Sequence, residues 1–151
     1  MKKAFLLILI FVSFNLKAIT WEIIGPCQIE PIYKGQLHLK DFSQNVGLVS
    51  LSVFKENNIP FQGNEGTIKN IDGLPGDHDF ISLGPSNYRA LGWCYEVNGK
   101  QPTLYMNKVF FKSNSDHLTW VLGQASFIDG KWTEYCTPVF SFQYPIFCSN
   151  K

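Results

Sequence analysis

The stretch from Leu91 to Gly99 constrains the fold of this chain more than any other segment. Apolar or aromatic residues occupy every second position, so they share one face of an extended strand. Asn98-Gly99 ends the stretch, and this dipeptide best tolerates the positive φ angles of a type I′ turn. We therefore predict a half-buried β-strand entering a hairpin turn, with one face formed by Leu91, Trp93, Tyr95 and Val97.

Residues 1–18 match a secretory signal peptide. Met1-Lys2-Lys3 is basic, an apolar run extends from Ala4 to Phe14, and Leu16-Lys17-Ala18 ends in a small residue. An apolar run of about 11 residues is short for a membrane span, which needs about 20. We therefore expect an exported protein, periplasmic or extracellular, with no membrane span after signal cleavage and one domain over residues 19–151.

The charge of this expected mature chain excludes nucleic acid as a natural partner. The whole sequence has a formal net charge of +1, and loss of Lys2, Lys3 and Lys17 would leave −2. The remaining basic residues are scattered, whereas binding of phosphates needs a clustered basic face.

Four cysteines lie in the expected domain. An even number in an exported chain predicts two disulfides. Zinc is the alternative, but there is no Cys-x-x-Cys pair and the spacings are long and irregular. The sequence does not choose among the three possible pairings of Cys27, Cys94, Cys136 and Cys148.

Other alternating segments predict a mainly antiparallel sheet. Strands are expected at Thr20–Ile24, Gly35–Leu39, Thr67–Asp72, Leu118–Ile128 and Lys131–Thr137, with turns at Asp72-Gly73 and Asp129-Gly130. In the last of these strands, Trp132, Glu134 and Cys136 should share one face, with Thr133 and Tyr135 on the other. Val139–Phe147 is expected to be a further extended run, and the Gly- and Pro-rich segment Leu74–Pro85 a loop.

The segment Val46–Asn58 allows two interpretations. Val49 to Val53 alternates as a strand would, yet the valines of the segment also have the spacing of one helix face. Ser43 or Asn45 would cap such a helix. Periodicity alone leaves helix and strand equal.

The order of these segments resembles the transcobalamin C-terminal-like domain, a bacterial family related to the C-terminal domain of transcobalamin and intrinsic factor. The similarity covers roughly residues 45 to 122 and is carried by Ile68-Lys69-Asn70-Ile71-Asp72-Gly73, Trp93-Cys94-Tyr95-Glu96-Val97-Asn98-Gly99 and Asp116-His117-Leu118-Thr119-Trp120. The resemblance implies an α+β domain of mainly antiparallel sheet with one helix, β-grasp-like in layout, and it favours a helix at Val46–Asn58. The cysteines go beyond the family pattern and imply a disulfide-stapled variant.

The resemblance implies a binding module rather than an enzyme. In transcobalamin and intrinsic factor such a domain closes over cobalamin together with a large helical domain, for which this chain has no room. We therefore expect cobalamin to bind no tighter than micromolar, and we expect no cofactor. The partner is either a small, corrinoid-like ligand in a concave aromatic pocket or an envelope protein that meets a sheet edge or apolar patch.

No catalytic or metal constellation is evident in the sequence. Motifs of α/β-hydrolases, metalloproteases and P-loop proteins are absent. Asp116 and His117 are adjacent on an expected strand, so their side chains should point to opposite faces. The acidic loop of Asp72, Asp77, His78 and Asp79 fails the EF-hand pattern and is interpreted as solvated.

Aromatic residues are the remaining candidates for a ligand site. Trp93, Tyr95, Trp120 and Trp132 occupy alternating strand positions, where aromatic rings form either a core or a binding surface. Both interpretations stay open. The candidate ligand-binding residues are Trp93, Tyr95, Asn98 and Trp120.

Overall fold

The computed structural model describes residues 18–148, so nearly all of the expected signal peptide lies outside it. The elements are β1 (Ile19–Ile24), β2 (Pro31–Leu37), α1 (Val46–Glu56), β3 (Phe61–Gly63), β4 (Ile68–Ile71), β5 (Phe80–Gly84), β6 (Asn87–Val97), β7 (His117–Ile128), β8 (Lys131–Pro138) and α2 (Pro145–Cys148), with short 3-10 turns at Met106–Lys108 and Val139–Ser141. Among the described residues, no helix combines the length and hydropathy that a membrane crossing requires.

One mixed sheet organises the fold, with strand order β2-β1-β7-β6-β5. β1 and β7 are parallel and every other pair in the sheet is antiparallel. The first half of β7 pairs with β1, and its second half pairs with β8 along the same edge. The expected α+β class with a mainly antiparallel sheet is confirmed, and the central parallel pair next to an N-terminal hairpin is the β-grasp layout.

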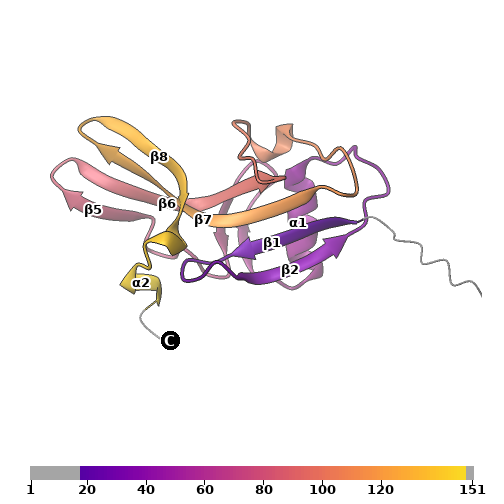
Figure 1. Cartoon of the computed structure of the whole chain (residues 1–151), viewed down its shortest axis with the longest axis horizontal. Coiled ribbons are helices and arrows are strands. Elements are labelled where there is room, and N and C mark those ends of the chain that lie inside the picture. Colours follow the sequence, from indigo (N-terminus) through magenta and orange to yellow (C-terminus); the bar gives the residue numbers. More distant parts are fainter. Residues whose placement is uncertain (1–17, 149–151) are drawn as a thin grey trace, which may run out of the picture.

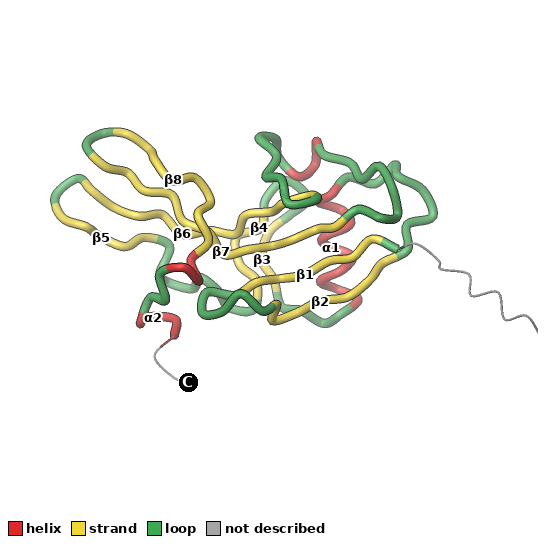
Figure 2. Tube along the Cα trace, in the orientation of Figure 1, coloured by secondary structure: helices red, strands yellow, loops and turns green. Residues whose placement is uncertain are grey.

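The sheet divides into two regions (Figure 1). On one side β1 and β2 lie in front of α1. On the other, β5 and β8 extend the distal halves of β6 and β7 into a projection, called the arm below (residues 80–92 and 122–138). Figure 2 shows the C-terminal segment leaving β8 and passing beneath the arm as two short helical turns.

The ambiguous segment Val46–Asn58 is helical in the structure from Val46 to Glu56 and forms α1. Asn45, one of the two expected caps, accepts a hydrogen bond from the Leu48 amide at 2.8 Å. Val46, Val49, Val53 and Phe54 are buried against the sheet. Because this apolar face covers the strands, tertiary packing selects the helical alternative that periodicity left open.

The two expected disulfides are present. They join Cys27 to Cys148 and Cys94 to Cys136, with Cα–Cα distances of 5.5 and 6.0 Å. The first ties the loop after β1 to α2, and the second ties β6 to β8.

Two expected segments are wrong. Leu74–Pro85 is not entirely a loop, because Phe80–Gly84 extends as β5 and pairs with β6. Val139–Phe147 is not extended: after Pro138 pairs with Gly123, the next positions on that edge of β7 are taken by β1. The chain therefore turns beneath the arm and buries Val139 completely. The structure also adds β3 and moves the second strand from Gly35–Leu39 to Pro31–Leu37.

The turn at Asn98-Gly99 forms, with φ angles of 54° and 68°. However, only Val97 and Lys100 pair across it. The chain then leaves the sheet and returns at His117 as β7, which is the true antiparallel partner of β6.

The expected alternation along β8 is wrong after Thr133. Glu134 and Cys136 both have φ angles of 54°, and the strand bulges so that Thr133 lies opposite Ser126 while Thr137 lies opposite Gln124. The bulge separates two side chains expected on one face. Glu134 accepts a hydrogen bond from the Ser126 hydroxyl at 2.7 Å, whereas Cys136 bonds to Cys94.

Candidate functional site

Three of the four candidate ligand residues line one pocket. Trp93, Tyr95 and Trp120 meet because Tyr95 pairs directly with Trp120 in the β6–β7 ladder and Trp93 follows two positions along the same face. The pocket has a volume of about 390 Å³ and is bounded by the chain entering β4 and by the excursion between β6 and β7. Its buried floor also includes Ile68 and Met106.

The polar atoms of these three aromatic residues already have partners within the fold. Trp93 Nε1 donates to the Leu74 carbonyl at 2.7 Å, and Trp120 Nε1 donates to the Ser50 hydroxyl at 3.2 Å. The Tyr95 hydroxyl donates to the Leu104 carbonyl at 2.6 Å, and burial raises the pKa of this phenol. The aromatic residues therefore offer carbon and ring surfaces to a ligand rather than hydrogen bonds.

The accessible rim of the pocket comes from residues that the sequence did not indicate. Trp93 and Trp120 are only 8% and 2% exposed, so most of their surface belongs to the core. Tyr105 is 70% exposed and Leu104 is 56% exposed, and both line the pocket beside Thr67 and Gln101. Their position depends on the path of the chain between Lys100 and His117, which no local pattern specifies.

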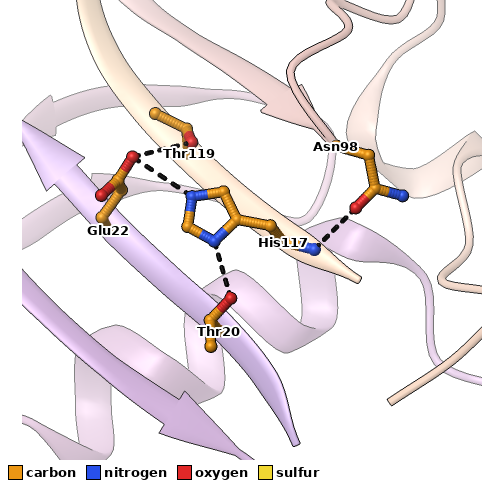
Figure 3. Close-up of polar contacts among 5 residues, drawn as sticks. All are labelled: Thr20, Glu22, Asn98, His117 and Thr119. Atoms are coloured by element: carbon orange, nitrogen blue, oxygen red, sulfur yellow. Dashed lines mark hydrogen bonds and ion pairs between the residues drawn. The ribbon is translucent and has the colours of Figure 1, made fainter. Parts of the chain in front are cut away.

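The structure places Asn98 outside this pocket, at the turn. Its Oδ1 accepts a hydrogen bond from the His117 amide at 2.8 Å, and its Nδ2 donates to Asp116 Oδ1 at 3.0 Å. Asn98 thus fastens the end of β6 to the start of β7 (Figure 3).

Trp132 also lies away from the pocket, on the arm. It is 41% exposed and makes edge contacts with Tyr88 and Phe127, at centroid distances of 5.5 and 5.4 Å. Phe80 extends this cluster through Tyr88 at 5.6 Å and is 66% exposed.

His117 has a carboxylate partner that the sequence did not reveal. Glu22, on the neighbouring strand β1, lies 3.2 Å from His117 Nε2, and the Thr20 hydroxyl lies 2.7 Å from Nδ1 (Figure 3). Asp116 instead accepts hydrogen bonds from the amides of Lys112 and Ser113. The row from Thr20 through His117 to Glu22 links β1 to β7 on an accessible face of the sheet, with His117 37% exposed.

The acidic residues of the loop at positions 72–79 do not form a metal site. Among residues 18–148, no three His, Cys, Asp or Glu side chains converge as ligands. Asp72 hydrogen-bonds to the Tyr33 hydroxyl, and the His78 ring contacts Phe147 at 5.8 Å.

Comparisons with known proteins do not assign this chain to a family. No family model matches the sequence, and no curated protein matches it. A solved structure from Ruminococcus gnavus ATCC 29149, described as a "putative metal binding protein", is similar with a TM-score of 0.41 and 17% identity. The similarity covers 72% of this chain and 97% of that one, and it is too low to carry an argument about function.

Proposed function

We propose that this protein is an exported, non-enzymatic binding module whose ligand occupies the pocket of Trp93, Tyr95 and Trp120. The observation that carries the proposal is the convergence of these three residues on one cavity of about 390 Å³. Ligand pockets commonly have volumes of about 300–1,000 Å³ and apolar, aromatic linings. A small ligand is therefore favoured over a large one.

The chemistry of the lining favours a flat, mainly apolar ligand. Ring faces and the side chains of Ile68 and Met106 supply the contact surface, while Thr67 and Gln101 supply polar groups at the rim. A corrinoid is larger than this cavity, so the protein could cover only one part of it. We accordingly expect a dissociation constant for cobalamin no tighter than micromolar in a calorimetric titration; nanomolar binding would refute this size argument.

Membership of the transcobalamin C-terminal-like family is part of the proposal. The β-grasp strand order and helix α1 agree with the layout that the resemblance implies. Export is supported by the basic and apolar residues of the signal pattern and by two disulfides, which persist in oxidising compartments. N-terminal sequencing of the exported protein should begin at Ile19; recovery of Met1 would contradict cleavage.

A direct test uses indole as a flat aromatic probe, followed by amide chemical shifts of the labelled protein. Addition of indole should shift the amides of Thr67, Tyr95 and Gln101. Tyr105→Ala removes an exposed rim side chain and should weaken these shifts. Tyr135→Ala is the matched control, because Tyr135 is 68% exposed and lies outside this pocket. Equal responses of the two variants, or no shifts at the pocket, would overturn the site.

The arm favours a second candidate function, the docking of an envelope protein. Phe80, Tyr88, Phe127 and Trp132 form an aromatic cluster across four strands, in which Phe80 and Trp132 are exposed and the other two rings are half-buried. Exposed apolar patches of this kind often mark interaction surfaces. A photo-crosslinking residue at position 132 should trap a defined partner in cells, whereas one at the exposed position 62 should not.

A further inference from the structure

A second pocket, separate from the aromatic one, lies where the N-terminal and C-terminal parts of the described chain meet. Its volume is about 330 Å³, and none of its lining residues is shared with the aromatic pocket. The loop after β1 contributes Pro26 and Cys27, and β2 contributes Ile32 and Tyr33. The segment after β4 contributes Asp72 and Leu74, and α2 contributes Phe147.

The Cys27–Cys148 disulfide holds the C-terminal wall of this pocket in place. It joins the loop after β1 to the residue that follows Phe147. The Phe147 ring is further supported by an edge contact with the His78 ring. The pocket is therefore assembled from distant segments by a covalent link rather than by a single loop.

The lining combines apolar walls with one ionisable acid. Pro26, Ile32, Leu74 and Phe147 present carbon, and Asp72 is the one carboxylate among the lining residues. No lysine, arginine or histidine lines the pocket. A charged ligand group that entered would therefore meet a negative partner and no positive one.

The Tyr33 hydroxyl orients this carboxylate. It donates a hydrogen bond to Asp72 Oδ2 at 3.0 Å. That hydrogen bond to the carboxylate, together with burial and the charge of Asp72, raises the pKa of Tyr33 above its ordinary value. A carboxylate has about four acceptor positions, and the phenol occupies one, so Asp72 retains capacity for a further donor.

We propose that this pocket binds a small organic ammonium ion, with its apolar body between Ile32, Leu74 and Phe147 and its ammonium group at Asp72. An ammonium group carries three donors for the carboxylate and is attracted to the face of an aromatic ring such as Tyr33. Asp77 and Asp79 lie on either side of His78, whose ring contacts the pocket wall, and they add negative charge on the same loop.

The probe for the test is 2-phenylethylammonium, and 2-phenylethanol is its neutral counterpart of similar shape. Binding to the disulfide-intact protein is measured by calorimetry or by chemical shifts. We expect the ammonium probe to bind at least about tenfold more tightly than the alcohol, because a hydrogen bond between two charged groups is stronger than one to a neutral hydroxyl. Equal affinities, or no binding of the ammonium probe, would overturn the proposal.

The decisive variant is Asp72→Asn, and Asp77→Asn is its matched control on the same loop. Asp72 has a φ angle of 54°, a conformation that asparagine also adopts readily, so the variant should fold. Asp72→Asn should weaken the ammonium probe at least about tenfold and leave the alcohol unchanged. Asp77→Asn, which removes a charge outside the lining, should change affinity less than about threefold. Equal effects of the two substitutions would refute a specific ammonium site at Asp72.

Discussion

The Sγ atom of Cys94 occupies the space that a side chain on Gly123 would need. A Cβ atom at Gly123 would lie 2.8 Å from this sulfur and 3.1 Å from the Cα atom of Cys136. Gly123 belongs to β7, which lies between the strands that carry the two cysteines. The disulfide therefore crosses the middle strand at a position that has no side chain.

This crossing predicts different effects for two paired glycines. Gly123→Ala should destabilise the protein by about 1–3 kcal/mol, because the added methyl group overlaps the disulfide and the backbone of β8. Gly92 lies directly opposite in β6, and a Cβ there meets nothing within 4 Å. Gly92→Ala should therefore leave the free energy of unfolding, measured by urea denaturation, nearly unchanged. A similar loss of stability in both variants would contradict the crossing.

The core position of Trp93 gives a second prediction. Trp93→Ala should cost about 3–5 kcal/mol, because it removes a buried ring and one of the two hydrogen bonds that the Leu74 carbonyl accepts. Trp132→Ala, the same substitution at a side chain 41% exposed, should cost clearly less. Denaturant midpoints of the two variants measure the difference, and equal losses would place the Trp93 ring outside the core.

The Asp116 carboxyl group predicts a loss of stability in acid. Burial alone would raise its pKa, but hydrogen bonds from Asn98 and from the Lys112 and Ser113 amides lower it below the ordinary value. A lowered pKa in the folded state stabilises the protein above the unfolded value of about 3.9, and this contribution disappears as pH falls through the folded pKa.

Asp116→Asn should therefore destabilise the protein at neutral pH by about 1–3 kcal/mol and flatten the decline of stability between pH 5 and pH 2. Asp77→Asn serves as an exposed control and should leave that slope unchanged. Thermal unfolding at a series of pH values gives the comparison. If the stability of Asp116→Asn falls with pH as steeply as that of the unaltered protein, another group causes the acid sensitivity.

The disulfides provide a fourth prediction. The intact mass should lie about 4 Da below that of the reduced chain, since each bridge removes two hydrogens. The double variant Cys27→Ser with Cys148→Ser should lose affinity for 2-phenylethylammonium, because Phe147 is no longer held at its pocket. The double variant Cys94→Ser with Cys136→Ser breaks a bridge outside that pocket and should retain it. Equal losses of affinity in the two double variants would show that the Cys27–Cys148 bridge has no specific role in holding the pocket.

Local sequence patterns predicted the elements that carry a clear period-two alternation or a specific turn dipeptide. Leu118, Trp120 and Leu122 alternate with Thr119 and Val121 in sequence, and this run forms β7 although residues 118–124 are buried on both faces; the turn at Asp129-Gly130 also forms as expected. The helix at α1 followed only from the family resemblance, because its valines fit both periods and its packing against the sheet decides between them.

The features that could not be predicted depend on tertiary contacts. Positive φ angles at Glu134 and Cys136 oppose the preferences of these residues and arise where β8 bulges beside the disulfide. The aromatic ring positions of Trp93, Tyr95 and Trp120 were predictable from alternation. The rim at Leu104 and Tyr105 was not, because it depends on an excursion of the chain outside the sheet.

The parallel pairing of β1 with β7 also determines when this chain can fold. Thr20 lies beside His117 and Ile24 lies beside Val121, so the centre of the sheet joins segments nearly a whole domain apart in sequence. Such high contact order slows folding, since a long loop must close before its contacts stabilise the product. For a chain exported as we propose, this delay would be useful: the N-terminal hairpin has no partner for its inner edge until residues 117–121 have emerged. The strand order therefore leaves the sheet incomplete until β7 is available.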